Sequence, residues 1–142
     1  LGIRVAGNDF MEGGHTNEES AIFCAEAEKV GVDAINVTGG WHETNVPQLT
    51  TNVPPGCFVY LARGIKEKVD VPVIASHRIN DPATAREMLA DDMCDMVAMG
   101  RSLIADPRLP EKARIQLREA LRGVNLLLRI IREHYRLDFI SR

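Results

Sequence analysis

Two arginines in matching positions are the residues of this sequence best suited to bind an anion. Arg78 follows the apolar run Val71–Ala75, and the pair Gly100-Arg101 follows the apolar run Met96–Met99. A guanidinium group offers a planar fork of N–H donors that matches a phosphate, and a glycine lets the backbone approach a ligand closely. If both runs are parallel strands, both arginines reach the same edge of a sheet. The pattern predicts a phosphate site, with surface ion pairs as the alternative for each side chain.

Arg4 differs from these two because it lies inside an apolar run, Gly2–Ala6. Its charge would point into the interior of the sheet or barrel, where an arginine is costly unless it is paired. An electron-rich edge of a ligand and an acidic side chain would both stabilise it, and the sequence leaves these alternatives open. His42, between Trp41 and Glu43, fits an acid or base, or more simply a loop histidine.

The cysteines and histidines do not indicate a metal site. Cys24, Cys57 and Cys94 lie far apart and form no C-x-x-C motif, which argues against zinc or an iron–sulfur cluster. The histidines show neither H-E-x-x-H nor H-x-x-E-H spacing. Unpaired cysteines fit a reducing compartment, and no apolar stretch of a signal peptide is visible near the first residue. We therefore expect a cytoplasmic protein without a bound metal.

Strands and helices have to alternate for the arginines to meet. Each of four short apolar runs is followed by polar or glycine-rich residues and then by a helical pattern, and runs that are apolar on both faces are typical of buried parallel strands. Such βα units form either a doubly wound sheet or a barrel, and a closed (βα)₈ barrel takes ~250 residues, about twice this length. The four predicted strands are Gly2–Ala6, Ala34–Val37, Val71–Ala75 and Met96–Met99.

The starts of the helices are marked by their capping residues. Thr16 followed by Glu19 has the form of a capping box, and Asp81-Pro82 places a capping carboxylate before a proline in the first turn. We expect helices over about 17–30 and 58–69, and a short helix near Ser102 whose free N–H groups would add to the phosphate site.

The last part of the chain differs from the rest in charge and in pattern. Residues 1–110 carry 9 basic and 16 acidic side chains, whereas residues 111–142 carry 8 basic and 4 acidic ones, within a net charge of −3. Apolar residues at spacings of three and four predict a long helix from about Pro110 to Tyr135, with arginines on a neighbouring face. This helix either covers the sheet or forms a subunit interface. The acidic body argues against nucleic-acid binding, and no apolar run reaches the ~20 residues of a membrane span.

Seven motifs of the sequence occur together and in a fixed order. They are Gly2-Ile3-Arg4-Val5, Gly13-Gly14-His15-Thr16, residues 31–37, Gly40-Trp41-His42-Glu43, residues 71–75, Arg78-Ile79-Asn80-Asp81-Pro82 and residues 95–107. Through these motifs the chain resembles the old yellow enzyme family, in particular the NAD(P)H:flavin oxidoreductases of the 2,4-dienoyl-CoA reductase and trimethylamine dehydrogenase type. The similarity covers residues 1–113, with the strands in the order of the family's C-terminal half.

The resemblance implies an α/β fold, the (βα)₄ half of a TIM barrel, over residues 1–113, followed by an added long C-terminal helix in residues 114–142. It implies FMN as the cofactor, with Arg4 at the pyrimidine end of the isoalloxazine ring; another phosphorylated ligand is the alternative. The FMN phosphate would meet Arg78, the backbone at His77, Gly100 and Arg101. The cofactor-binding residues implied are Arg4, Ser76, His77, Arg78, Gly100 and Arg101.

Two departures from the family pattern matter. His77 stands where the family usually has glycine, and its side chain would either crowd the phosphate or donate to it. The family's substrate-binding residues belong to the other half of the barrel, so catalytic residues stay unassigned and we expect weak or no turnover. A half-barrel leaves two sheet edges and an apolar interior open, which predicts a homodimer. The alternative is a phosphate-binding or purely structural half-barrel that dimerises through its open face or its C-terminal helix.

Overall fold

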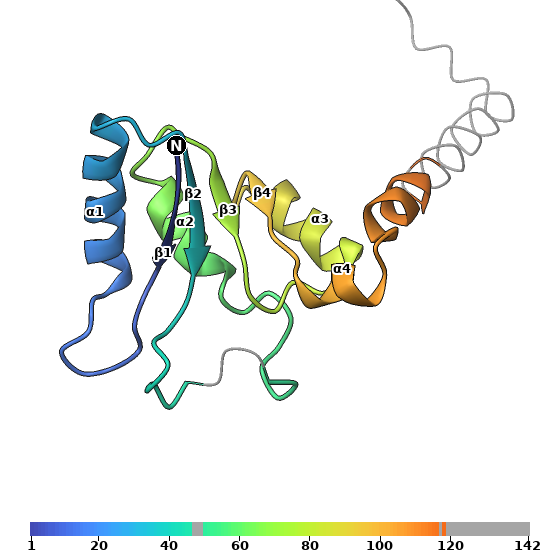
Figure 1. Cartoon of the computed structure of the whole chain (residues 1–142), viewed down its shortest axis with the longest axis horizontal. Helices are drawn as coiled ribbons and strands as arrows, with labels where there is room; N and C mark the ends of the chain where they lie inside the picture. The colour runs from blue at the N-terminus through green and yellow to red at the C-terminus, as the bar shows by residue number, and fades with distance from the viewer. Residues whose placement is uncertain (47–49, 117, 119–142) are drawn as a thin grey trace, which may run out of the picture. The chain divides into compact units, whose positions relative to one another are not determined.

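A computed structural model describes residues 1–46, 50–116 and 118. Four parallel strands lie side by side in the order of the sequence, and helices connect them (Figure 1). The sheet and its helices form an α/β fold, as the sequence predicted. The elements are β1 (Gly2–Ala6), α1 (Asn17–Lys29), β2 (Ala34–Thr38), α2 (Val59–Lys66), β3 (Val73–Ala75), α3 (Pro82–Ala90), β4 (Met96–Val97) and α4 (Arg101–Ala105).

The predicted capping residues begin their helices. Thr16 and Glu19 form the full capping box of α1, with 2.8 Å between the Thr16 N–H and the Glu19 carboxylate. Asp81 caps α3 by accepting from the N–H groups of Ala83 and Thr84, both at 2.9 Å. Each contact satisfies backbone donors that a helix leaves free in its first turn.

Most predicted boundaries shift by a few residues. The strand expected from Val71 begins at Val73, and Pro72 before it has no N–H for the ladder. The strand expected over Met96–Met99 is only Met96–Val97, an edge strand with a partner on one side. The helix expected over 58–69 spans Val59–Lys66.

The core lies on one face of the sheet. Ile35 and Val37 of β2 point into it, where Leu61 and Ile65 of α2 are buried against them. Residues two apart on a strand share a face, so the remaining strand positions form the opposite face. That face carries Arg4, Asn36, Ile74 and Met96, which pair in register across the four strands.

The opposite face corrects one expectation. The apolar runs predicted strands buried on both sides, but Arg4 is exposed and Met96 is 51% exposed. No helix of the described part of the chain covers these side chains. The runs are therefore half-buried strands, and their open face is available to a ligand or a partner.

The predicted long C-terminal helix falls mostly outside the described residues. Residues 109–116 and 118 are helical, and the expected continuation to Tyr135 lies beyond them. The chain divides into two compact units, Leu1–Ile104 and Ala105–Arg142, and the sheet belongs entirely to the first. None of the helices in the described ranges has the length and apolar character needed to cross a membrane.

Candidate anion-binding pocket

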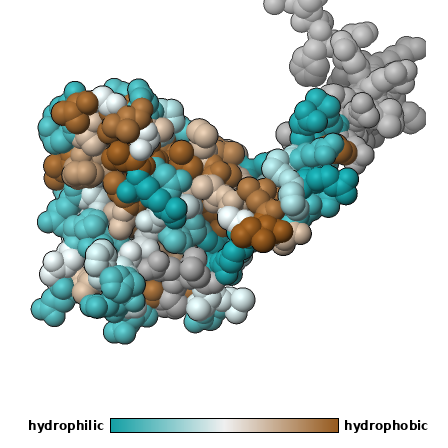
Figure 2. Space-filling model, in the orientation of Figure 1, coloured by the Kyte–Doolittle hydropathy of each residue, from teal (hydrophilic) through white to brown (hydrophobic). Residues whose placement is uncertain are grey.

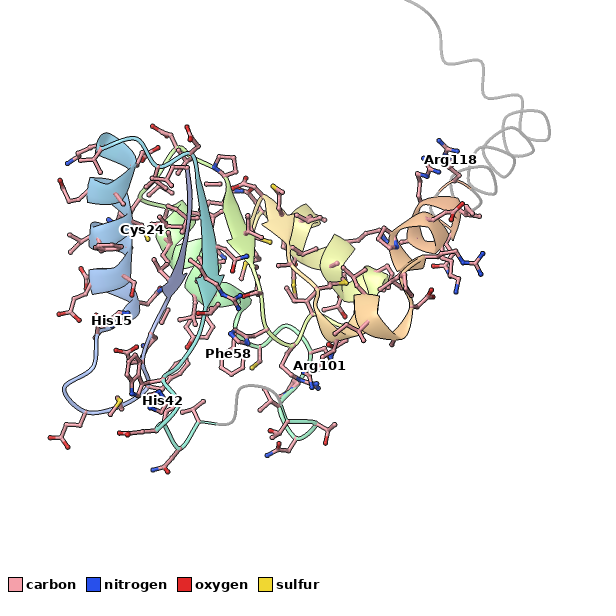
Figure 3. The ribbon with its side chains drawn as sticks, in the orientation of Figure 1. His15, Cys24, His42, Phe58, Arg101 and Arg118 are labelled. Atoms are coloured by element: carbon pink, nitrogen blue, oxygen red, sulfur yellow. The ribbon has the colours of Figure 1, made fainter. Side chains whose placement is uncertain are left out.

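All six predicted site residues line one pocket of about 440 Å³ at the carboxyl ends of the strands. Arg4 reaches it from β1, and the other five come from the segments that follow β3 and β4. Figure 3 shows Arg101 among the loops at this end of the sheet. The lining residues are Arg4, Asn36, Ser76, His77, Arg78, Ile79, Asn80, Ala98, Met99, Gly100 and Arg101.

The segment after β3 is held in place by three hydrogen bonds to the loop and strand beside it. Ser76 Oγ donates to the carbonyl of Val37 at 2.5 Å, and Arg78 Nε donates to the carbonyl of Val53 at 2.9 Å. The N–H of Gly56 in turn donates to the carbonyl of Arg78 at 2.8 Å. The Arg78 side chain is therefore oriented by the protein before any ligand arrives.

His77 and Arg78 both adopt left-handed backbone conformations, with φ of 68° and 54°. This region costs a residue with a Cβ about 1–2 kcal/mol, and such strain tends to persist at functional sites. Neither residue is glycine, so their residue types did not predict a left-handed turn. Its one signal was the glycine that the resembled family usually carries at position 77.

The segment after β4 leaves open space beside its backbone. A Cβ added at Gly100 would meet no atom of the described chain within 4 Å, so a ligand can approach the main chain there. The short helix begins at Arg101 rather than at Ser102. Ser102 Oγ donates to the carbonyl of Asn80 at 3.0 Å, which links this segment to the one after β3.

The pocket carries a concentrated positive charge. Arg4, Arg78 and Arg101 line it, and no aspartate or glutamate appears among the described residues around it. No ion pair joins Arg4 to a carboxylate in the described ranges, which answers one of the alternatives left open by the sequence. Burial lowers the pKa of His77, and the charges of Arg4 and Arg101 lower it further.

Two buried polar atoms of this pocket's residues have no hydrogen-bond partner among the described residues: Asn36 Oδ1 and His77 Nε2. Buried polar groups are nearly always paired, so these two atoms are candidates to bond a ligand in the pocket. Sequence reasoning missed Asn36. Its signal was its position between Ile35 and Val37, which places it on the face opposite the core.

His42 lies apart from the pocket. Its ring lies beside that of Trp41, tilted by 36° with 4.8 Å between centroids; its Nε2 is 3.8 Å from Glu43 Oε1, and its side chain is 74% exposed. The geometry fits the simpler interpretation, a loop histidine. Its contact with the Glu43 carboxylate lies on the exposed surface and not in the pocket.

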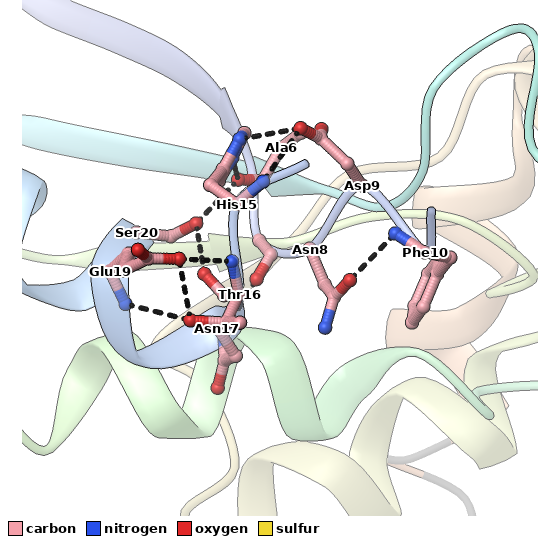
Figure 4. Close-up of polar contacts among 10 residues, drawn as sticks. Ala6, Asn8, Asp9, Phe10, His15, Thr16, Asn17, Glu19 and Ser20 are labelled. Carbon is pink, nitrogen blue, oxygen red and sulfur yellow. Dashed lines mark hydrogen bonds and ion pairs between the residues drawn. The ribbon is translucent and has the colours of Figure 1, made fainter. Parts of the chain in front are cut away.

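The loop after β1 is fixed by a second histidine (Figure 4). His15 Nδ1 lies 2.7 Å from the Asp9 carboxylate, and Nε2 lies 3.0 Å from the carbonyl of Ala6. The loop also supports its neighbour, because the N–H of Gly40 donates to the carbonyl of Asn8 at 2.6 Å. These contacts hold the two loops together at the end of the sheet that carries the pocket.

The parallel βα architecture with a cationic pocket at the strand ends is typical of α/β proteins that bind phosphorylated ligands. Comparison with known proteins defines the family. The chain belongs to the NADH:flavin oxidoreductase / NADH oxidase family, whose model matches residues 1–120. The resemblance found in the sequence is thereby confirmed.

Several relatives show the same similarity. A metal reductase of Desulforamulus reducens is 61% identical over 111 residues, 78% of this chain and 17% of the relative. An NADH oxidase of Thermoanaerobacter brockii is 38% identical over 116 residues, 80% of this chain and 18% of the relative. The solved 2-naphthoyl-CoA reductase complex with 2-naphthoyl-CoA superposes with a TM-score of 0.74 at 32% identity, covering 80% of this chain and 17% of that one. The chain thus spans about a sixth of the length of these relatives.

Proposed function

We propose that residues 1–113 are the (βα)₄ half of a TIM barrel that holds FMN in an NAD(P)H-dependent oxidoreductase. The observation that carries the proposal is the pocket itself, which is lined by three arginines and, among the described residues, by no aspartate or glutamate. A phosphate monoester brings about two negative charges near pH 7, which would balance most of this positive charge. Membership of the flavin oxidoreductase family supports FMN as the phosphate ester.

The residues present fit this cofactor. Arg78 and Arg101 would bind the phosphate, and the open backbone at Gly100 would let it approach. Arg4, on the open face of the sheet, would lie under the electron-rich edge of the ring, where a cation favours the reduced flavin. Bound FMN would supply the hydride-transfer chemistry, and this chain's residues would bind and orient it.

Turnover by this chain alone should be weak or absent. The described pocket residues include no aspartate or glutamate, His77 would face the phosphate, and His42 is exposed on its loop. The relatives that reduce metals, bilirubin or coenzyme A thioesters are several times longer than this chain. If the isolated chain oxidised NADH with an enone as fast as full-length flavin reductases do, this part of the proposal would be wrong.

FMN titration followed by flavin fluorescence tests the site. Removing one charge-assisted contact costs about 1.5–3 kcal/mol, so Arg101→Ala should weaken FMN binding roughly 10- to 100-fold. Arg63→Ala is a matched control, because that arginine pairs with Glu67 outside the pocket. Equal affinity of the two variants, or no saturable binding by the wild type, would refute the proposed site.

The open sheet face favours a second candidate function, that of a structural or phosphate-binding module that forms a homodimer. Ile74 and Met96 lie on this face without a covering helix in the described part of the chain. A second copy closing over them would bury apolar surface that otherwise stays in water. Light scattering should then report a dimer, and Met96→Asp should yield a monomer. A wild-type monomer across the micromolar range would exclude this alternative.

A further inference from the structure

Among the described residues that line the pocket, His77 is the one titratable side chain besides the arginines. It lines the pocket from the turn after β3, and its buried Nε2 atom lacks a hydrogen-bond partner among the residues described. The left-handed φ of 68° shows that the backbone keeps the turn that glycine would favour, although a side chain is present.

The groups around His77 are cationic or uncharged. Arg4 faces it from β1 and Arg101 from α4, and both disfavour a charged imidazole. The ring of Phe58, in the loop before α2, lies edge-on with 6.2 Å between centroids. Arg78 is adjacent in the chain, and Asn36 of β2 adds only a neutral amide to the pocket. No carboxylate lines this pocket within the described ranges to hold a proton on the imidazole.

These surroundings keep the ring neutral while the pocket holds no anion. Burial and the two arginines all lower the pKa of His77, so the neutral form dominates near neutral pH. An anion in the pocket reverses the balance, because its charge offsets the guanidinium groups and its oxygens accept hydrogen bonds. The imidazolium form then becomes the favoured one, with N–H groups on both ring nitrogens.

We propose that His77 couples anion binding in this pocket to the uptake of one proton. The proton comes from solvent and adds to the unprotonated ring nitrogen, with no other bond made or broken. The inference rests on the proposed function for the location of the phosphate, and it deepens that function by adding control by pH. Because the pKa of His77 would be higher in the complex than in the free pocket, anion binding should strengthen as the pH falls from the higher value to the lower one.

Isothermal titration calorimetry with the full chain tests the coupling. Each titration is run in two buffers of different ionisation enthalpy, so the proton uptake is read directly. Two probes are needed, because the phosphate of FMN itself takes up a proton near pH 6 and then binds with less charge. Sulfate keeps its charge over the whole range, so any pH dependence of its binding belongs to the protein.

For the wild type we expect sulfate affinity to fall about 3- to 10-fold from about pH 6 to about pH 7.5, with uptake approaching one proton per anion. His77→Gln should bind sulfate and FMN with no proton uptake by the protein. His77→Gly should behave in the same way and should fold readily, since glycine accepts the left-handed turn. His42→Gln, an exposed histidine outside the pocket, should keep the wild-type dependence.

The outcomes separate the two proposals. If neither FMN nor sulfate binds at any pH, the proposed function fails, and the coupling fails with it. If FMN and sulfate bind but proton uptake is the same in wild type and His77→Gln, only the coupling is refuted. Proton uptake that disappears in both His77 variants and persists in His42→Gln would support it.

Discussion

Replacing Gly64 with alanine tests how α2 is docked against the first loop of the sheet. A Cβ at position 64 would lie 2.0 Å from Oδ1 and 3.1 Å from Cγ of Asn17, so the amide would have to move. That amide joins two elements, because Asn17 Nδ2 donates to the carbonyls of Gly7 and Leu61, both at 3.0 Å. The substitution should therefore break the link between the end of β1 and α2.

The two opposing effects differ in size. In a helix interior, alanine is about 1 kcal/mol more favourable than glycine. Each lost hydrogen bond costs about 0.5–1.5 kcal/mol, with more for a partly buried carbonyl left unpaired, so two of them outweigh the gain. Gly64→Ala should lower the free energy of unfolding by about 1–2 kcal/mol and the melting temperature by about 3–8 °C.

A double-mutant cycle followed by circular dichroism during urea unfolding measures this effect. In an Asn17→Ala background the amide is absent, so Gly64→Ala should stabilise the chain by about 1 kcal/mol through helix propensity alone. The change of sign between the two backgrounds is the expected result. If Gly64→Ala had the same effect in both backgrounds, the contact would not control the docking of α2.

Two further substitutions test a helix cap and the turn after β3. Asp81→Ala should cost about 1 kcal/mol at neutral pH, because the carboxylate caps α3. The hydroxyl and N–H of Thr84 lower the pKa of Asp81. The stability that the cap contributes is therefore present above the usual carboxyl pKa and is lost as the pH falls through the lowered pKa. In acid unfolding curves, the difference in stability between the wild type and Asp81→Ala should disappear. Ser76→Ala should lower the free energy of unfolding by about 1 kcal/mol, because it removes the hydrogen bond to Val37; urea titration measures this change. The same substitution should weaken FMN binding far less than Arg101→Ala does, which fluorescence titration measures. An FMN affinity as low as that of Arg101→Ala would show that the Ser76 hydroxyl contacts the ligand directly.

Local signals in the sequence predicted the order of the elements well. The capping box at Thr16 and the Asp81-Pro82 pair set helix starts because their hydrogen bonds are made within one turn. Strand lengths were harder to predict than helix starts. The length of β4 depends on its pairing with a neighbouring strand and not on its own residues. The exposure of Met96 has the same origin: an apolar run predicts burial, but only the fold decides which face is covered.

The part of the candidate site that is set by the strand order could be predicted from the sequence. Arg78 and Arg101 meet because parallel strands end at one edge, which the spacing of the runs already indicates. Asn36 was missed because its position between Ile35 and Val37 becomes informative only once the face of the sheet that carries the core is known. The residue type of His77 did not predict its left-handed turn, which is held by the hydrogen bonds of Arg78 with Val53 and Gly56.

The strand order has a consequence for how the chain folds during synthesis. Each strand pairs with the one made just before it, so the sheet can grow by one βα unit at a time as residues leave the ribosome. Contacts between successive units close short loops, and such loops form quickly. Arg4 is synthesised among the first residues of this part and Arg101 among its last, so the pocket is completed only when the fourth unit has docked. An anion that binds there should therefore stabilise only chains whose sheet is already complete.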